Sequence, residues 1–420
     1  MFAVTGLFHL GLPDFEQPGW TPPLLLHGLG CLILLKRPSV AGFAISMIAI
    51  LWPLIFLRDV LTQSMLMLFM SVGGLIACIR PSFSATDAAR VLGAFTYFLA
   101  VLHKLNTDFL NPDISCANHA LDVIKAHWIG MDWTWIPAPA LPWFAIIVEG
   151  TLGVFLLRGS LLVWPLGFLF HLPLTVTLAP AFGAVMFGTY AAAMSKRNWW
   201  RMKRAWRRHH RLMIASAVAF FVIQAALEGG VSIALPWIQS MLGWVLSMMA
   251  LMAWSASRRS SRPAFRPVRK VAWVMGLAWG LHGLTPYLGI QYQHTAAMLS
   301  NLRIDRPCRN SMVMPYAPRE FDPYIRIDVA RIGSGLRPER ERVLVSQLWS
   351  VPALAAMHRN WCVPHLRPIY LSGTVESVAW TIPDLCHSDW VQHLPPQNWP
   401  TGFQRFQKNL LRQCEAPCIH

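Results

Sequence analysis

Hydrophobic residues gather into long uninterrupted runs over the first 290 positions, and polar residues separate much shorter apolar runs after that point. A helix needs about 20 mostly apolar residues to cross the hydrocarbon core of a bilayer, and most of the long runs approach that length. The first and seventh runs are short and could be re-entrant or tilted, so we expect about nine or ten spans. The runs lie at 22–35, 40–57, 63–79, 89–106, 140–157, 160–178, 181–194, 211–232, 237–254 and 271–290.

The pattern predicts two domains. Residues 1–290 are expected to form an all-α polytopic membrane bundle, and residues 291–420 a small α+β extramembrane domain. Within the second domain, the apolar runs Ile325–Val329 and Ile369–Val378 are typical of strands. Helical spacing over 341–358 predicts a helix that Pro352 breaks or kinks.

Composition excludes an ordinary soluble globular protein, because 13% of residues are charged and 55% are hydrophobic, against roughly 25% charged residues in soluble domains. The net charge of +16 comes largely from two loop blocks without acids. Short basic loops beside membrane helices are typical of the cytoplasmic face, and they favour contact with anionic lipid headgroups over nucleic acid. The blocks are Lys196, Arg197, Arg201, Lys203, Arg204, Arg207, Arg208 and Arg211, and Arg258, Arg259, Arg262, Arg266, Arg269 and Lys270.

This orientation predicts a multi-pass protein of the cell membrane, with the N-terminus, the 107–138 loop and the C-terminal domain on the outer face. Asp14 and Glu16 near the start argue against a cleavable signal peptide. Six cysteines fall on the outer face, where an oxidising compartment favours disulfides. A metal site of Cys414, Cys418 and His420 is the less favoured alternative. The six are Cys116, Cys308, Cys362, Cys386, Cys414 and Cys418.

Ionisable residues inside the predicted spans are the candidates for chemistry, since a charge at membrane depth is costly and normally has a partner or a role. Lys104, beside His103, ends the fourth span, and burial disfavours the charged form of an amine, as a general base requires. The alternative for Lys104 is that its long stem reaches the interface. Glu149 and His171 lie on the next two spans and could share a polar cavity with Lys104, or each could hold a neighbouring helix by a hydrogen bond.

Three stretches of the chain, in order, resemble one known family. The first is Tyr97–Phe109, including His103-Lys104-Leu105-Asn106, followed by His127-Trp128. The second is Phe168–His171 with the 182–187 segment, and the third is Leu284–Gly289 with Met298–Arg303. Over roughly residues 20–310 the chain is similar to the horizontally transferred transmembrane (HTTM) domain family, which contains the vitamin K-dependent gamma-carboxylase.

The resemblance implies a membrane enzyme of the gamma-carboxylase type, acting as a lyase or oxidoreductase on a quinone-like substrate, with a quinone as cofactor and no metal. It implies that Lys104 is the base on the hydroquinone and that His171 is a second catalytic or quinone-contacting residue. An asparagine–histidine pair of the carboxylase has no counterpart in residues 59–64, which argues against full carboxylation chemistry. The expected substrate-binding residues are His103, Asn106, Glu149, His127 and Tyr287.

Two other classes of function remain open. A non-catalytic membrane scaffold would present the outer domain to a protein partner. A transporter would also use a broken last span, here at Pro286 and Gly289, although no inverted repeat is visible. Nucleotide-binding loops, serine-nucleophile elbows and zinc-protease motifs are absent from the sequence, so the soluble hydrolase and dehydrogenase classes have no support.

Overall fold

The computed structural model describes the greater part of the chain. The described residues are 21–52, 62–127, 137–177, 180–227, 267–288, 295–297, 299–303, 305, 308–314, 324–333, 338–362, 368–375, 378–394, 410–415 and 418.

The chain divides into two compact units. The helical unit comprises Met1–Leu102 and Cys116–His282. The C-terminal unit comprises Gly283–His420 together with the short segment His103–Ser115, which interrupts the helical unit in the sequence. The segment 103–115 therefore groups with the residues that follow position 283.

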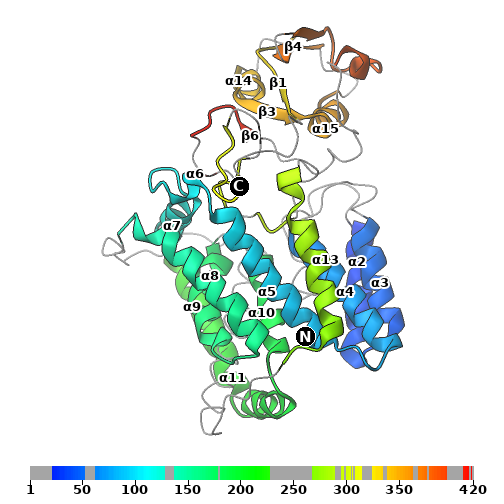
Figure 1. Cartoon of the computed structure of the whole chain (residues 1–420), viewed down its shortest axis with the longest axis vertical. Helices are drawn as coiled ribbons and strands as arrows, with labels where there is room; N and C mark the ends of the chain where they lie inside the picture. The colour runs from blue at the N-terminus through cyan, green and yellow to red at the C-terminus, as the bar shows by residue number, and fades with distance from the viewer. Residues whose placement is uncertain are drawn as a thin grey trace. The chain divides into compact units, whose positions relative to one another are not determined.

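The helical unit is built from ten helices among the described residues (Figure 1). They are α2 (Thr21–Lys36), α3 (Val40–Trp52), α4 (Thr62–Ile79), α5 (Ala85–Lys104), α7 (Cys116–His127), α8 (Ala140–Arg158), α9 (Val163–Thr177), α10 (Pro180–Ala192), α11 (Lys196–Leu227) and α13 (Trp273–Gly283), the last preceded by the turn η3 (Lys270–Ala272).

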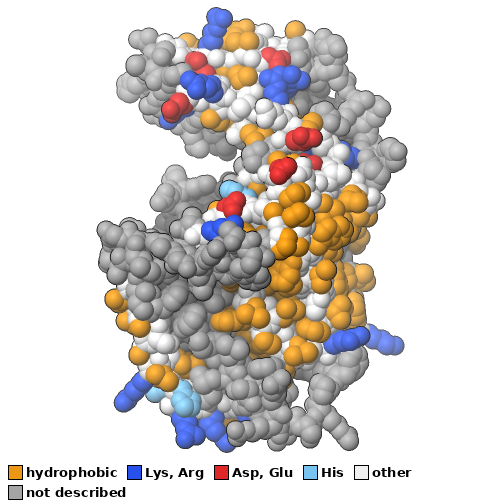
Figure 2. All heavy atoms as spheres, turned by 90° about the vertical axis from the view of Figure 1, so that its left-hand side faces the viewer, with side chains coloured by type: hydrophobic (Ala, Val, Ile, Leu, Met, Phe, Trp, Pro, Cys, Tyr) orange, Lys and Arg blue, Asp and Glu red, His pale blue; other side chains and the backbone are white. Residues whose placement is uncertain are grey.

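Three of these helices, α4, α5 and α8, are long and apolar enough to cross a membrane, and α2 and α3 are shorter apolar helices. Membrane-length apolar helices are therefore confirmed, and hydrophobic side chains cover much of the helical unit on the face that Figure 2 shows. The expected count of about nine or ten spans is not supported. A run of apolar residues can continue past the end of a helix, so its length overestimates the helix. The runs at 160–178 and 181–194 contain α9 and α10, which have only 15 and 13 residues. The expected span at 237–254 lies outside the described residues.

Local sequence determines where α5 begins and where α8 ends. The hydroxyl of Ser84 accepts the amide hydrogen of Asp87 at 3.2 Å, an interaction that caps the first turn of α5. Gly159, with φ 65°, follows α8 in the left-handed conformation, and its amide donates to Leu156 as in a Schellman ending. Both ends therefore have the residue types that their backbone geometry requires.

Arg90 joins these two helices. Its guanidinium is fully buried and donates to the carbonyls of Leu156 at 3.0 Å and Leu157 at 2.7 Å, at the carboxyl end of α8. Asp87, one turn earlier on α5, pairs with the same guanidinium at 3.3 Å. A cation at a helix C-terminus is favourable because unpaired carbonyls and the helix dipole make that end negative.

Small residues let other helices approach α5 closely. A Cβ added to Gly276 of α13 would lie 2.2 Å from Val91, and one added to Gly153 of α8 would lie 2.7 Å from Phe98. Such contacts leave no room for a larger residue, in the manner of small-residue packing between membrane helices. They place α5 against both neighbours inside the helical unit.

The C-terminal unit contains two three-stranded antiparallel sheets. The first has the order β1 (Tyr324–Arg326), β3 (Gln347–Ser350), β6 (Leu410–Leu411), and the second has the order β2 (Val329–Ile332), β4 (Ile369–Val375), β5 (Val378–Ile382). The helices are α6 (Thr107–Leu110), α14 (Pro338–Ser346) and α15 (Val351–Trp361), with the turns η4 (Thr285–Leu288) and η6 (Trp390–His393). Strands in both predicted apolar runs, and thus the expected α+β character, are confirmed.

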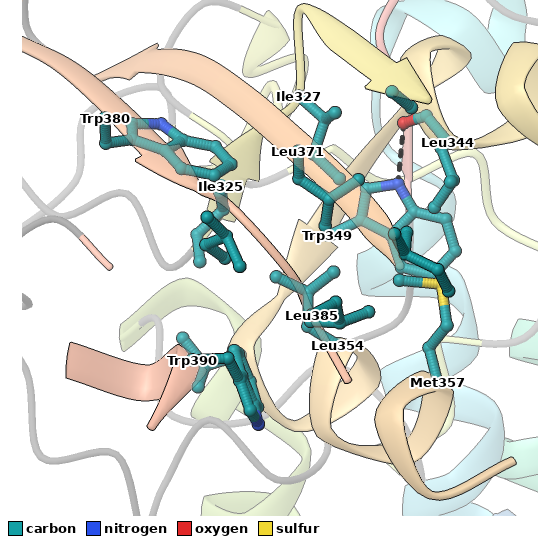
Figure 3. Close-up of a cluster of buried hydrophobic side chains, with 14 of the residues drawn as sticks. Ile325, Ile327, Leu344, Trp349, Leu354, Met357, Leu371, Trp380, Leu385 and Trp390 are labelled. Carbon is teal, nitrogen blue, oxygen red and sulfur yellow. Dashed lines mark hydrogen bonds between the residues drawn. The ribbon is translucent and has the colours of Figure 1, made fainter. Parts of the chain in front are cut away.

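A hydrophobic cluster fills the space between these strands and helices (Figure 3). Ile325 and Leu371, from different sheets, and Leu354 of α15 are each fully buried. Trp349 lies among them and donates its indole hydrogen to the carbonyl of Leu344 at 2.9 Å. The segment 341–358, expected to be helical with a break or kink at Pro352, is interrupted earlier, by β3 between α14 and α15. Pro352 instead lies in the first turn of α15, where a missing amide hydrogen costs no helical bond.

Disulfides in the C-terminal unit are also confirmed. Cys308 pairs with Cys414 and Cys362 pairs with Cys386, across sequence separations of 106 and 24 residues. Cys116 and Cys418 are disulfide-bonded as well. Among the described residues, no group of three or more His, Cys, Asp or Glu side chains could hold a metal ion.

Candidate functional site

His103 is fixed by both ring nitrogens inside the C-terminal unit. It is fully buried, with Nε2 3.1 Å from the carbonyl of Thr295 and Nδ1 3.1 Å from the hydroxyl of Tyr287. A carbonyl can only accept, so Nε2 carries a hydrogen, and in the neutral ring Nδ1 accepts from the tyrosine. The two rings stack with centroids 5.4 Å apart. The histidine is therefore held in one orientation and one tautomer.

Lys104 is buried beside this histidine, with 5% of its surface exposed. Its Nζ lies 5.7 Å from the centroid of the Phe109 ring, itself 1% exposed. The chain turns sharply after α5 and forms the short helix α6, which brings Phe109 back to the amine. The sequence left burial and a stem extended to the interface as alternatives, and the structure shows burial.

Asn106 holds this turn together. It is fully buried, and its Oδ1 accepts the amide hydrogen of Phe109 at 2.7 Å. Its Nδ2 donates to the carbonyls of His103 at 2.7 Å and Ser300 at 2.5 Å. Every polar atom of the amide thus bonds to backbone, so Asn106 positions the residues around Lys104. The sequence assigned it substrate contact, which stays a prediction.

The described residues between 295 and 311, here called the 295–311 loop, have an unusual backbone. Ala296, Leu299 and Asn301 have φ angles of 64°, 53° and 52°, in the left-handed region that residues other than glycine rarely adopt. Each such residue costs of the order of 1 kcal/mol, and such residues concentrate at functional sites. Asn310 holds the loop by donating to the carbonyl of Asn301 at 2.7 Å and accepting from the amide of Arg303 at 2.8 Å.

A buried ion pair anchors the same loop. Arg303 and Asp305 make two parallel hydrogen bonds, from Nε at 2.7 Å and from Nη2 at 2.8 Å, and their side chains are 7% and 0% exposed. The third guanidinium nitrogen donates to the carbonyl of Gln413 at 2.9 Å. Sequence reasoning noted Arg303 within a motif and missed Asp305, because nothing in the linear pattern distinguishes this aspartate from a solvated one.

A second polar cluster lies within the helical unit. The hydroxyl of Tyr97 on α5 is 2.7 Å from Nε2 of His171 on α9 and is hydrogen-bonded to the hydroxyl of Tyr190 on α10. All three residues are buried, and Glu149 of α8, 7% exposed, interacts electrostatically with both tyrosines. Sequence reasoning missed Tyr190. The available signal was a tyrosine in an otherwise apolar helix, where a buried hydroxyl normally has a partner.

The predicted site residues therefore fall into two groups. His103, Lys104, Asn106 and Tyr287 come together in the C-terminal unit, and His171 and Glu149 belong to the cluster in the helical unit. Their convergence on one shared cavity stays a prediction. His127 is the last residue of α7, and its side chain lies outside the described part of the structure.

Comparison of the chain with family models, with curated proteins and with solved structures finds no match.

Proposed function

We propose that this protein is a membrane enzyme that acts on a quinone-like or other lipophilic substrate, with Lys104 as its base. The observation that carries the proposal is the buried Lys104 amine, held against the Phe109 ring and next to a histidine whose two ring nitrogens are both bonded. A buried primary amine with a positioned environment is a suitable general base. The resemblance of this stretch to the HTTM family supports the same role.

The geometry around Lys104 suits acceptance of a proton. A neutral amine that removes a proton from a substrate hydroxyl becomes an ammonium ion, and the face of an aromatic ring attracts that ion. The contact with Phe109 therefore strengthens as the proton arrives. The 295–311 loop supplies the Thr295 carbonyl to His103, and hydrogen bonds of Asn310 hold its strained backbone.

The other assignments belong to the same proposal. His171 is a second catalytic or quinone-contacting residue, with Glu149 and His127 as further substrate contacts. A quinone is the expected cofactor. The protein is expected to lie in the cell membrane with about nine or ten spans. The disulfides support placing the C-terminal domain on the outer, oxidising face.

Replacing Lys104 with Met should remove the activity while preserving the fold, because Met keeps the length of the buried stem and lacks the amine. The assay is oxygen-dependent oxidation of a reduced naphthoquinone by the full chain in liposomes. Loss of a general base typically costs 10²–10⁴-fold in rate, so we expect a decrease of about that size. Lys104→Arg should be equally inactive, since a guanidinium keeps the charge and cannot act as a base.

The matched control is Lys125→Met, because Lys125 is a partly exposed lysine of α7 paired with Asp122. It should retain full activity, and all variants should melt at similar temperatures. Wild-type turnover by Lys104→Met would reject the base. A self-contained C-terminal core favours one alternative, a scaffold that presents this domain to a protein partner. That alternative predicts that a Lys104 variant keeps the cellular function and that deletion of the domain abolishes it.

The proposed topology has its own test. Single cysteines introduced at Arg204 and at Arg342, in a background whose free Cys31 and Cys78 are replaced, should react with an impermeant maleimide from opposite sides of the membrane. The cysteine at position 342 should react in intact cells. The cysteine at position 204 should react only after permeabilisation, because basic loops remain in the cytoplasm. Labelling of both positions from the same side would contradict the topology.

A further inference from the structure

The first half of α11 is strongly basic and contains no acidic residue. Its described basic side chains are exposed, except Arg201, which is half-buried. They lie at one end of the helical unit, where Figure 2 shows Lys, Arg and His side chains gathered. The exposed members are Lys203, Arg204, Arg207, Arg208 and Arg211.

These five side chains share one face of the helix. With 3.6 residues per turn, they fall within an arc of about 140°. The opposite face packs into the protein, where Met213 is 4% exposed. Trp200 lies on the basic face and is 66% exposed, with the Lys203 ammonium 5.5 Å from the centre of its ring. An exposed tryptophan beside cations is typical of the membrane–water interface.

The same face becomes apolar one turn further along. Ile214, Val218 and Val222 are 46%, 47% and 55% exposed and follow each other at intervals of four residues. Their positions fall inside the arc of the basic side chains. From Arg211 to Val222 the helix rises roughly 16 Å, which is about half of the 30 Å hydrocarbon core, or one leaflet.

We propose that this face of α11, from Lys203 to Val222, binds an anionic phospholipid of the cytoplasmic leaflet. The guanidinium groups of Arg208 and Arg211 hold the phosphate, since planar guanidinium groups match phosphate oxygens geometrically. The stripe of Ile214, Val218 and Val222 lies along one acyl chain. The inference goes beyond the proposed enzyme activity and is independent of Lys104.

The order of the side chains favours a lipid over a nucleic acid. A nucleic acid needs a basic surface alone, and an apolar stripe that continues the basic face would add nothing to its binding. A phospholipid needs both parts, at separations that match the headgroup and one leaflet. The absence of any acid on α11 leaves the whole face complementary to an anion.

The test is native mass spectrometry of the full chain in detergent, titrated with phosphatidylglycerol. Each Lys or Arg near an anionic membrane surface contributes about fivefold in affinity, so Arg208→Gln with Arg211→Gln should weaken binding about thirtyfold. Phosphatidylcholine should bind far more weakly than phosphatidylglycerol. Glycerol phosphate, which has the headgroup without acyl chains, should not displace the lipid.

The matched control is Arg331→Gln with Arg342→Gln, which removes two exposed arginines from the C-terminal unit. It should bind phosphatidylglycerol as wild type does. Equal weakening in both double variants, or equal affinity for the two lipids, would overturn the proposal. Displacement of the lipid by inorganic phosphate or by an RNA oligonucleotide would also overturn it, because either result would show a site for anions alone.

Discussion

Replacing Cys308 and Cys414 with Ala should lower the free energy of unfolding of the C-terminal unit by about 4–5 kcal/mol. The physical reason is that a cross-link restricts the unfolded chain, and the restriction grows with the length that it encloses. This bond spans a sequence separation of 106 residues. Thermal or denaturant unfolding of the oxidised and variant proteins in detergent would measure the loss.

The second disulfide supplies the control for that prediction. Cys362 and Cys386 enclose a separation of only 24 residues, so their replacement should cost about 3.5 kcal/mol. A larger loss from the shorter cross-link would contradict the chain-entropy explanation. It would indicate that packing around Cys362 and Cys386 governs stability in this unit.

Asp305→Asn should destabilise the C-terminal unit by about 3–5 kcal/mol, because it leaves the Arg303 guanidinium buried without its anion. The change conserves size, so the loss reports charge pairing rather than a cavity. Hydrogen exchange should accelerate in the 295–311 loop, where Arg303 also holds the carbonyl of Gln413. The melting temperature and the exchange rates of the loop amides together measure the effect.

Asp328→Asn is the comparison for this variant. Asp328 pairs with Arg326 and Arg412, and its side chain is 32% exposed. Solvent screens such a pair, so the loss should stay below about 1 kcal/mol. If Asp305→Asn proved as mild as Asp328→Asn, the buried pair would not anchor the loop.

The pattern of apolar and polar residues predicted the helices and strands of this fold. Apolar runs became helices in the first unit, and the runs after residue 324 became strands, because solvent preference along the chain determines which face is buried. The described helices do not support the expected number of spans, because a hydropathy run does not show where a helix ends. Pro352 was interpreted as a residue that breaks or kinks a helix, yet it lies in the first turn of α15. Proline is disfavoured in a helix only beyond that turn.

The candidate site was predictable only in part. Lys104 and His103 stood out because titratable residues at the end of an apolar helix are costly. The partners of His103, Tyr287 and Thr295, come from far along the chain, whereas the Phe109 ring beside Lys104 is five residues away. Tyr190 was not identified for the same reason. Its hydroxyl matters through its bond to Tyr97, which depends on how α5 and α10 pack. The local sequence shows only a tyrosine in a mostly apolar helix and does not identify its partner.

The bond between Cys308 and Cys414 turns the intervening stretch into a closed ring that leaves and rejoins the rest of the chain at one place. Arg303 contacts the residue before Cys414, so the junction is also tied by a backbone carbonyl. The residues inside such a closed loop can be replaced without moving the two points where the loop joins the rest of the chain. Segments of other lengths, inserted between residues 315 and 409, would join the chain at the same disulfide, so the residues within this loop can be exchanged while Asn310 and the Lys104 environment stay intact.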